Sequence, residues 1–135
     1  MWEKTKNLAN LDGGIYRSIL GYAGESIAIG RALVCGYNLF FKAWRDAKYD
    51  AVLDSKNNLF RVEIKQTSGD SSLTLTSGGR GGKQIKDEVK KGDESREKVL
   101  STDDCDFVIG VQSLRGNCWI IPVELLEILG KKSIT

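Results

Sequence analysis

The chain has 135 residues, 41% of them hydrophobic, which suits one domain with a single core and is short for two. Its formal net charge of +2 neither indicates nor excludes nucleic acid as a partner. There is no histidine, and the three cysteines lack metal-binding spacing, so zinc sites, Ser-His catalysis and Cys-His catalysis are excluded and any chemistry must use carboxylates, lysine, tyrosine or a bound metal.

The first 14 residues are polar and end in the breaker cluster Asp12-Gly13-Gly14, so residues 1–14 are predicted to form an N-terminal arm. They contain no apolar signal-peptide core, and no apolar run of the chain approaches the length of a membrane span. We therefore expect a cytoplasmic protein without a membrane partner, in which residues 1–135 form a single domain.

A long helix is predicted over residues 15–34, because apolar residues recur on one face at 100° per residue. Tyr22 and Leu33 are expected on this buried face, and Gly36 is a fitting C-terminal cap. Glu25 falls at the edge of the face, beside small residues that let another backbone come close: Gly21, Ala28 and Ala32. Glu25 then either faces solvent next to a tight helix–sheet contact or points into a functional site.

A hairpin is predicted after this helix. Residues 39–44 form a first strand or its lead-in, and the hairpin strands cover residues 49–54 and 60–66. Asn57 and Asn58 are predicted as a two-residue tip, because asparagine tolerates positive φ.

The second hairpin strand carries an acid and a lysine on one face, since Glu63 and Lys65 are two residues apart. The predicted turn sets Asp50 opposite Lys65 and Val52 opposite Glu63. Asp50, Glu63 and Lys65 then converge on one surface. Asp46 is the rival acid, but Asp50 opens the apolar run of its strand and is preferred.

The converging side chains suit a divalent metal. Two close carboxylates repel each other unless a cation neutralises them, and hard oxygen ligands suit Mg²⁺, for which Mn²⁺ can substitute. A lysine beside such a metal can position or help to deprotonate a water, or stabilise charge on a phosphate oxygen. The alternative interpretation is a solvated ladder of charges in which Asp50 simply pairs with Lys65.

A helical glutamate, an aspartate at a strand start and Glu-x-Lys on the next strand resemble the PD-(D/E)XK nuclease superfamily, over roughly residues 15–66. Tyr49 stands where the motif has proline. The resemblance implies an α/β fold with a restriction-endonuclease-like core, a central mixed β-sheet flanked by helices. It also implies the site: Asp50, Glu63 and the carbonyl of Ile64 as metal ligands, Lys65 orienting the attacking water, and Gln66 and Glu25 completing or polarising the site.

A glycine-rich segment, residues 77–84, precedes a strongly charged helix predicted over residues 83–100. The segment either brings backbone N–H groups to phosphate or is a flexible connection, and no G-K-[ST] follows that would make it a nucleotide-binding loop. The helix is either a solvated surface helix or lies along DNA. The DNA contacts predicted here are Arg80, Lys83, Gln84, Lys86 and Lys90.

The C-terminal part is predicted as a second hairpin, residues 106–112 and 117–121, with the first strand apolar throughout as in a buried central strand. Pro122 opens a closing helix over residues 123–129, and Gly130 caps it. This ending resembles that of small PD-(D/E)XK nucleases.

The function predicted from these features is Mg²⁺-dependent hydrolysis of DNA phosphodiester bonds. The first interpretation is a small site-specific type II restriction-type endonuclease that acts on double-stranded DNA as a homodimer. A junction-resolving enzyme acting on branched DNA and an intron-encoded homing endonuclease are the alternatives. A non-catalytic DNA-binding module with the same fold, or a protein-interaction domain with a fortuitous Glu-x-Lys, would belong to other classes.

Overall fold

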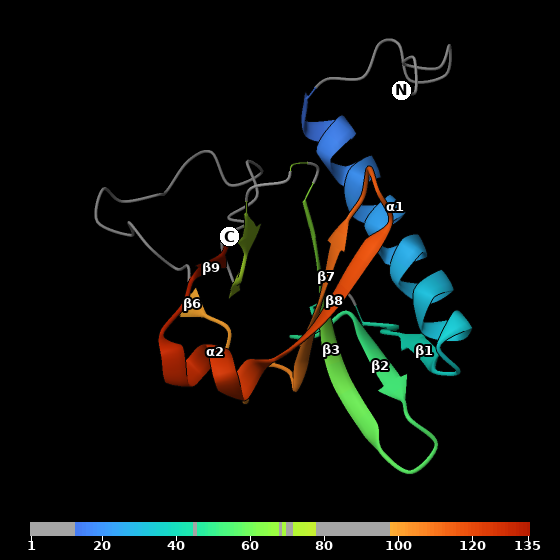
Figure 1. Ribbon diagram of the computed structural model, residues 1–135, viewed down its shortest axis with the longest axis vertical. Helices are drawn as coiled ribbons and strands as arrows, with labels where there is room; N and C mark the ends of the chain where they lie inside the picture. Colours follow the sequence, from blue (N-terminus) through green and yellow to red (C-terminus); the bar gives the residue numbers. More distant parts are fainter. Residues whose placement is uncertain (1–12, 45, 68, 70–71, 78–97) are drawn as a thin grey trace.

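The computed structural model describes residues 13–44, 46–67, 69, 72–77 and 98–135 (Figure 1). Its core elements are α1 (Gly13–Val34), β1 (Asn38–Phe41), β2 (Ala51–Asp54), β3 (Leu59–Thr67), β7 (Phe107–Gln112), β8 (Asn117–Pro122) and α2 (Val123–Leu129). The described residues also form four short strands, which are β4 (Leu73–Thr74), β5 (Thr76–Ser77), β6 (Lys98–Val99) and β9 (Ser133–Ile134).

The central sheet has five strands in the order β1-β2-β3-β7-β8. Strands β3 and β7 run parallel, and each of the other neighbouring pairs is antiparallel. Helix α1 lies along one side of the sheet and α2 lies at the other (Figure 1). The predicted α/β class, with a central mixed sheet flanked by helices, is confirmed.

Each face of the sheet has its own apolar cluster. Alternation along β3 sends Val62 and Ile64 to the α1 face and Glu63 to the opposite face. The cluster under α1 contains Ala28, Leu39, Ala51, Leu53, Val62, Ile64, Ile109 and Val111. The cluster on the α2 face contains Leu73, Leu75, Leu100, Cys105, Val108, Val123 and Leu126.

The turn of the β2–β3 hairpin differs from the predicted two-residue tip. Asp54 pairs with Leu59, so the loop has four residues, and the positive φ falls on Lys56 at 73° rather than on an asparagine. The Asp54 carboxylate causes this difference, because its Oδ1 accepts a hydrogen bond from the Lys56 N–H at 2.9 Å and starts the turn earlier.

The register of the hairpin is consequently shifted by two residues. Val52 lies opposite Arg61, not opposite Glu63 as predicted. The same shift moves Asp50 away from its predicted position opposite Lys65. Because side chains alternate with a period of two, a shift by an even number of residues leaves every residue on its predicted face. Asp50, Glu63 and Lys65 therefore still lie on the same face of the sheet.

The buried stripe of α1 also differs from the prediction. Tyr22 and Leu33 are 70% and 57% exposed, whereas Gly24 and Ala28 are buried against the sheet. The sheet approaches α1 closely, so Gly24 and Ala28 face it directly, and Ile27 and Ile29 pack against the same cluster while only partly buried. The helix starts at Gly13, two residues earlier than predicted. Residues 1–12 of the predicted arm lie outside the described residues.

The prediction of a charged helix over residues 83–100 is wrong for its last three residues, 98–100. Lys98–Val99 forms β6, which pairs with β5, and Leu100 is fully buried in the cluster on the α2 face. Leu100 contributes more stability in the core than on a solvated helix. The rest of that helix and residues 78–82 of the glycine-rich segment lie outside the described residues, as do the predicted DNA contacts Arg80, Lys83, Gln84, Lys86 and Lys90.

The C-terminal elements agree with the prediction. Strand β7 is buried along nearly its whole length, and β8 follows as its antiparallel partner. Helix α2 ends at Gly130, which adopts the left-handed conformation with φ of 59° that favours glycine. Gly36 ends α1 in the same way with φ of 81°. Within the described residues, no helix combines the length and apolar character that a membrane span requires.

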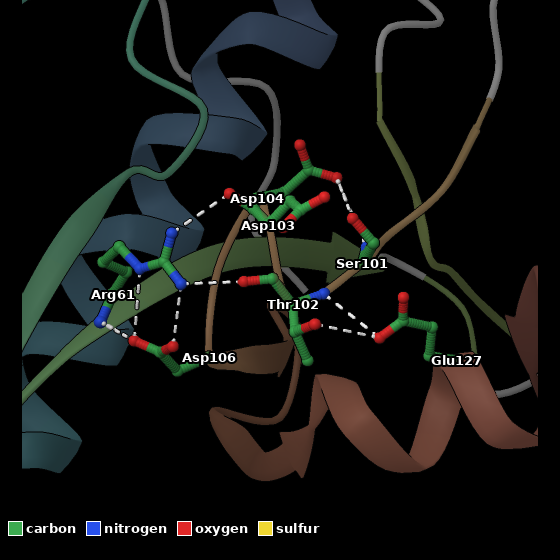
Figure 2. Close-up of polar contacts among 7 residues, drawn as sticks. All are labelled: Arg61, Ser101, Thr102, Asp103, Asp104, Asp106 and Glu127. Atoms are coloured by element: carbon green, nitrogen blue, oxygen red, sulfur yellow. Dashed lines mark hydrogen bonds and ion pairs between the residues drawn. The ribbon is translucent and has the colours of Figure 1, made fainter.

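Arg61 at the start of β3 fixes the loop that leads into β7 (Figure 2). Its Nη2 donates to Asp106 Oδ1 at 2.9 Å, and its backbone N–H donates to Asp106 Oδ2 at 2.7 Å. The guanidinium also donates to the carbonyls of Asp103 and Thr102, and the Thr102 hydroxyl donates to Glu127 of α2 at 3.1 Å. This network joins β3, the loop and α2.

The Arg61–Asp106 pair predicts a pH-dependent contribution to stability. Hydrogen bonding from the Arg61 side chain lowers the pKa of Asp106 below its ordinary value of 3.8. The contribution is therefore complete at neutral pH and is lost as the pH falls below 3.8 through the folded-state pKa. Asp106→Asn should lower the free energy of unfolding by about 1 to 2 kcal/mol at neutral pH, because the pair is partly exposed.

Urea unfolding of both proteins between neutral and acidic pH measures this difference, which should shrink in acid. Asp103→Asn is the matched control, because Arg61 bonds the Asp103 backbone carbonyl and not its carboxylate. A difference between wild type and Asp106→Asn that stays constant down to about pH 2 would contradict the assignment.

Candidate active site

The site lies where the β2–β3 ladder ends. Strand β2 begins at Ala51, opposite Val62, whereas β3 continues to Thr67. The Asp50 N–H still donates to the Val62 carbonyl at 2.9 Å, and Asp50 Oδ2 accepts a hydrogen bond from the Ile64 N–H at 2.8 Å. The Asp50 side chain thus supplies the acceptor that a continuing β2 would otherwise give to Ile64, since a backbone donor in a sheet requires a partner.

The Ile64 hydrogen bond also gives the direction of its carbonyl. The N–H and C=O of one strand residue point to the same side of the strand. The Ile64 carbonyl therefore points to the side on which Asp50 lies. A carboxylate and a backbone carbonyl, both hard oxygen donors, are directed toward one region.

A lysine that the sequence analysis did not single out holds Asp50. Lys42 follows β1, and its Nζ lies 3.1 Å from Asp50 Oδ1 and 3.3 Å from the Ala47 carbonyl oxygen. Pairing of Phe41 with Ala51 brings Lys42 opposite Asp50, so a known β1–β2 register would have revealed it. Asp46, the rival acid, lies between the strands with an exposed side chain.

Glu63 and Lys65 form the second ion pair of the site. Lys65 Nζ lies 2.8 Å from Glu63 Oε1, and the two side chains are only 24% and 14% exposed, respectively. Burial raises the pKa of Glu63, Lys65 opposes this rise, and the charge of Asp50 adds to it. The two carboxylates are therefore close enough to repel each other, as the sequence predicted.

Glu25 approaches the same region from α1. Burial raises the pKa of Glu25, the Asp50 charge raises it further, and Lys42 lowers it. Gly24 permits this approach, because a Cβ at its position would lie only 2.9 Å from the Cβ of Gln66. The absence of a side chain at Gly24 thus lets α1 pack directly on β3 and brings Glu25 near Asp50.

Gln66 lies on the face of β3 that α1 covers, opposite to the face of Glu63 and Lys65. Its Oε1 accepts a hydrogen bond from the Ser113 hydroxyl at 3.1 Å. Gln66 thereby links β3 to the turn after β7. The structure brings together Asp50, Glu63, Lys65 and Glu25, and it places Gln66 on the other side of the strand.

Cys105 does not offer an alternative chemistry beside this site. Cys105 is buried in the cluster on the α2 face, and burial raises the pKa of its thiol to about 12. The thiol is therefore protonated at neutral pH and is a poor nucleophile. Among the residues that the structure describes, no three Asp, Glu or Cys side chains form a group arranged to hold a metal ion.

No protein-family model matches the sequence, and no curated protein matches it. Among solved structures, the chain is similar to a bacterial homing endonuclease, I-Ssp6803I, with a TM-score of 0.64 and 17% identity over 87% of this chain and 75% of that chain. At this identity the likeness shows a shared fold, which is the α/β, nuclease-like fold predicted from the sequence.

Proposed function

We propose that the protein is a DNA endonuclease of the PD-(D/E)XK superfamily that requires Mg²⁺, or Mn²⁺ in its place. The observation that supports this most strongly is the grouping of Asp50, Glu63 and Lys65 beside the end of the β2–β3 ladder. The sheet that carries them belongs to a fold that a homing endonuclease also has.

The residues fit a divalent cation by the chemistry of their donor atoms. Asp50 and Glu63 supply carboxylate oxygens, and the Ile64 carbonyl points to the Asp50 side of β3. Oxygen donors with remaining positions left to water suit Mg²⁺. Among the described residues, no three acidic or thiol side chains are grouped so that they could hold a metal ion by themselves. The proposed ligands therefore include the Ile64 carbonyl and water as well as Asp50 and Glu63. A bound cation would supply Lewis acidity and a polarised water.

Lys65 and Glu25 act on the proposed reaction without binding the cation. Lys65 Nζ opposes the rise that burial causes in the pKa of Glu63, and it can donate to the attacking water or to a non-bridging phosphate oxygen. Glu25 lies near Asp50 and can accept a hydrogen bond from a water in the site. Gln66 contributes by holding β3 against the turn at Ser113.

A homing endonuclease is the favoured biological role, ahead of the restriction-type enzyme that the sequence suggested first. The similar solved structure is a homing endonuclease, and this supports the alternative more than the first interpretation. Digestion of total genomic DNA separates the two roles. Many discrete fragments would indicate a short recurrent site and a restriction-type enzyme, whereas one or very few cuts would support the homing role.

We also propose that the protein acts as a homodimer on duplex DNA. The two scissile phosphates of a duplex have opposite polarity, and a two-fold axis presents two identical sites to them. Sedimentation of the protein on a DNA duplex that contains its site tests this, with two protein chains expected for each duplex. One chain per duplex would leave only nicking of a single strand.

The endonuclease proposal is tested by incubating supercoiled plasmid with the full chain. Nicked or linear DNA should form with Mg²⁺ and should not form when a chelator removes the cation. A plasmid library with varied inserts is needed, because a long recognition site is absent from most plasmids. DNA binding without any cleavage in Mg²⁺ or Mn²⁺ would instead support the non-catalytic DNA-binding module.

A further inference from the structure

A second lysine, Lys42, belongs to the charge group of the site although the Glu-x-Lys motif does not include it. Its Nζ pairs with Asp50 Oδ1 at 3.1 Å, and its backbone N–H donates to the Asp50 carbonyl at 3.1 Å. Both side chains of the pair are largely buried, with 24% of Lys42 and 20% of Asp50 exposed. The pair is therefore screened less by solvent than an ordinary surface ion pair.

Lys42 acts electrostatically on every acid of the group. Its charge lowers the pKa of Glu25 and of Glu63, in addition to its direct contact with Asp50. Lys65 contacts Glu63. The ammonium groups of Lys42 and Lys65 thus lie beside the three carboxylates of the group. They balance much of the negative charge of these carboxylates within the chain.

Both oxygens of Asp50 are engaged. Oδ2 accepts the Ile64 N–H, which is part of the sheet, and Oδ1 accepts the Lys42 ammonium. A carboxylate oxygen has further lone pairs, but an ammonium and a divalent cation on the same oxygen repel each other strongly. Lys42 therefore occupies the Asp50 oxygen that is less committed to the fold.

We infer that Lys42 is a built-in counter-ion that holds Asp50 in the cation-free protein and gives up Oδ1 when a divalent cation binds. The inference rests on the proposed function, since it requires Asp50 to be a cation ligand. It assigns Lys42 a positioning role that the motif does not predict. Its consequence is that Lys42 weakens cation binding in the absence of DNA while it holds the Asp50 side chain in place.

Cation affinity of charge-altered variants tests the inference. Lys42→Met removes the charge and keeps most of the side-chain length, so Mn²⁺ should bind roughly tenfold more tightly than to wild type because one repelling charge is gone. Lys42→Arg keeps the charge and should stay near the wild-type affinity. Free Mn²⁺ is measured by electron paramagnetic resonance at slightly alkaline pH without DNA.

Lys48→Met is the matched control, because it also removes one positive charge but its Nζ pairs with Asp104 at 3.5 Å and not with Asp50. Its Mn²⁺ affinity should equal that of wild type. Unchanged or weaker binding by Lys42→Met overturns the inference. If wild type binds Mn²⁺ and cleaves DNA in that case, the proposed function stands and only the role of Lys42 fails. A wild type that neither binds Mn²⁺ nor cleaves DNA refutes both.

Amine labelling of the wild-type protein gives a second measurement that does not depend on a variant. Saturating Mn²⁺ should increase the labelling rate of Lys42 severalfold, because its amine leaves the partly buried ion pair with Asp50 and becomes more accessible to the reagent. Lys48, quantified in the same mass spectra, should show no change. A Lys42 labelling rate that is the same with and without Mn²⁺ overturns the inference.

Discussion

Asp50→Asn and Glu63→Gln are each expected to reduce DNA cleavage by about a thousandfold or more, because several kcal/mol of charge stabilisation at the phosphate depend on a bound cation. These substitutions keep the size of each side chain and remove its charge. Asparagine at position 50 retains an oxygen that can accept the Ile64 N–H, so the end of the β2–β3 ladder should stay intact.

Alanine at position 50 would be a poorer choice, because it leaves the Ile64 N–H without this acceptor and mixes a folding defect with the chemical one. Thermal unfolding checks that both amide variants fold, and plasmid cleavage measures their rates. Asp46→Asn is the matched control and should cleave at the wild-type rate. Full cleavage by Asp50→Asn together with loss in Asp46→Asn would move the acid to Asp46.

Lys65→Met is expected to lower the cleavage rate by about two to four orders of magnitude while cation and DNA binding persist, because its charge acts mainly on the transition state. Lys65 Nζ also lies 2.8 Å from Glu63 Oε1, and its charge opposes the rise that burial causes in the pKa of Glu63. Part of the loss could therefore arise from protonation of Glu63. Single-turnover rates across pH separate the two contributions.

The two roles of Lys65 predict different pH dependences for the cleavage rate of Lys65→Met. Removing Lys65 should raise the pKa of Glu63 further, so the variant should need a higher pH than wild type to ionise Glu63. A deficit that persists at alkaline pH supports direct action of Lys65 on the water or phosphate. Complete recovery at alkaline pH would restrict Lys65 to supporting Glu63. Loss of DNA binding with normal turnover of bound substrate would make Lys65 a phosphate anchor.

Local patterns in the sequence were sufficient for much of the fold and for part of the site. Alternation along residues 60–66 predicts that Glu63 and Lys65 share one face, and this requires no knowledge of the neighbours. Gly36 marks the end of α1, and the limits of β7, β8 and α2 follow from apolar runs bounded by Gly116, Pro122 and Gly130. These signals operate over a few residues, so the chain alone carries them.

Other features depend on which segments pack together, and only the tertiary structure decided them. The side-chain bond from Asp54 to Lys56 set the hairpin loop and shifted the register. The close approach of β3 selected Gly24 and Ala28, not Tyr22, as the buried side of α1. Periodicity alone did not predict that approach, because both sides of the helix carry apolar or small residues.

The members of the site divide in the same way. The sequence by itself determined the alternating acid and lysine of β3, because a strand fixes the direction of its own side chains, and it placed Asp50 directly before the apolar run of β2. The pairing of Lys42 with Asp50, the turn of Gln66 toward Ser113 and the approach of Glu25 were decided by the tertiary structure. Each of these depends on how separate elements meet: the β1–β2 register sets the first, the β3–β7 pairing sets the second, and the packing of α1 on β3 sets the third.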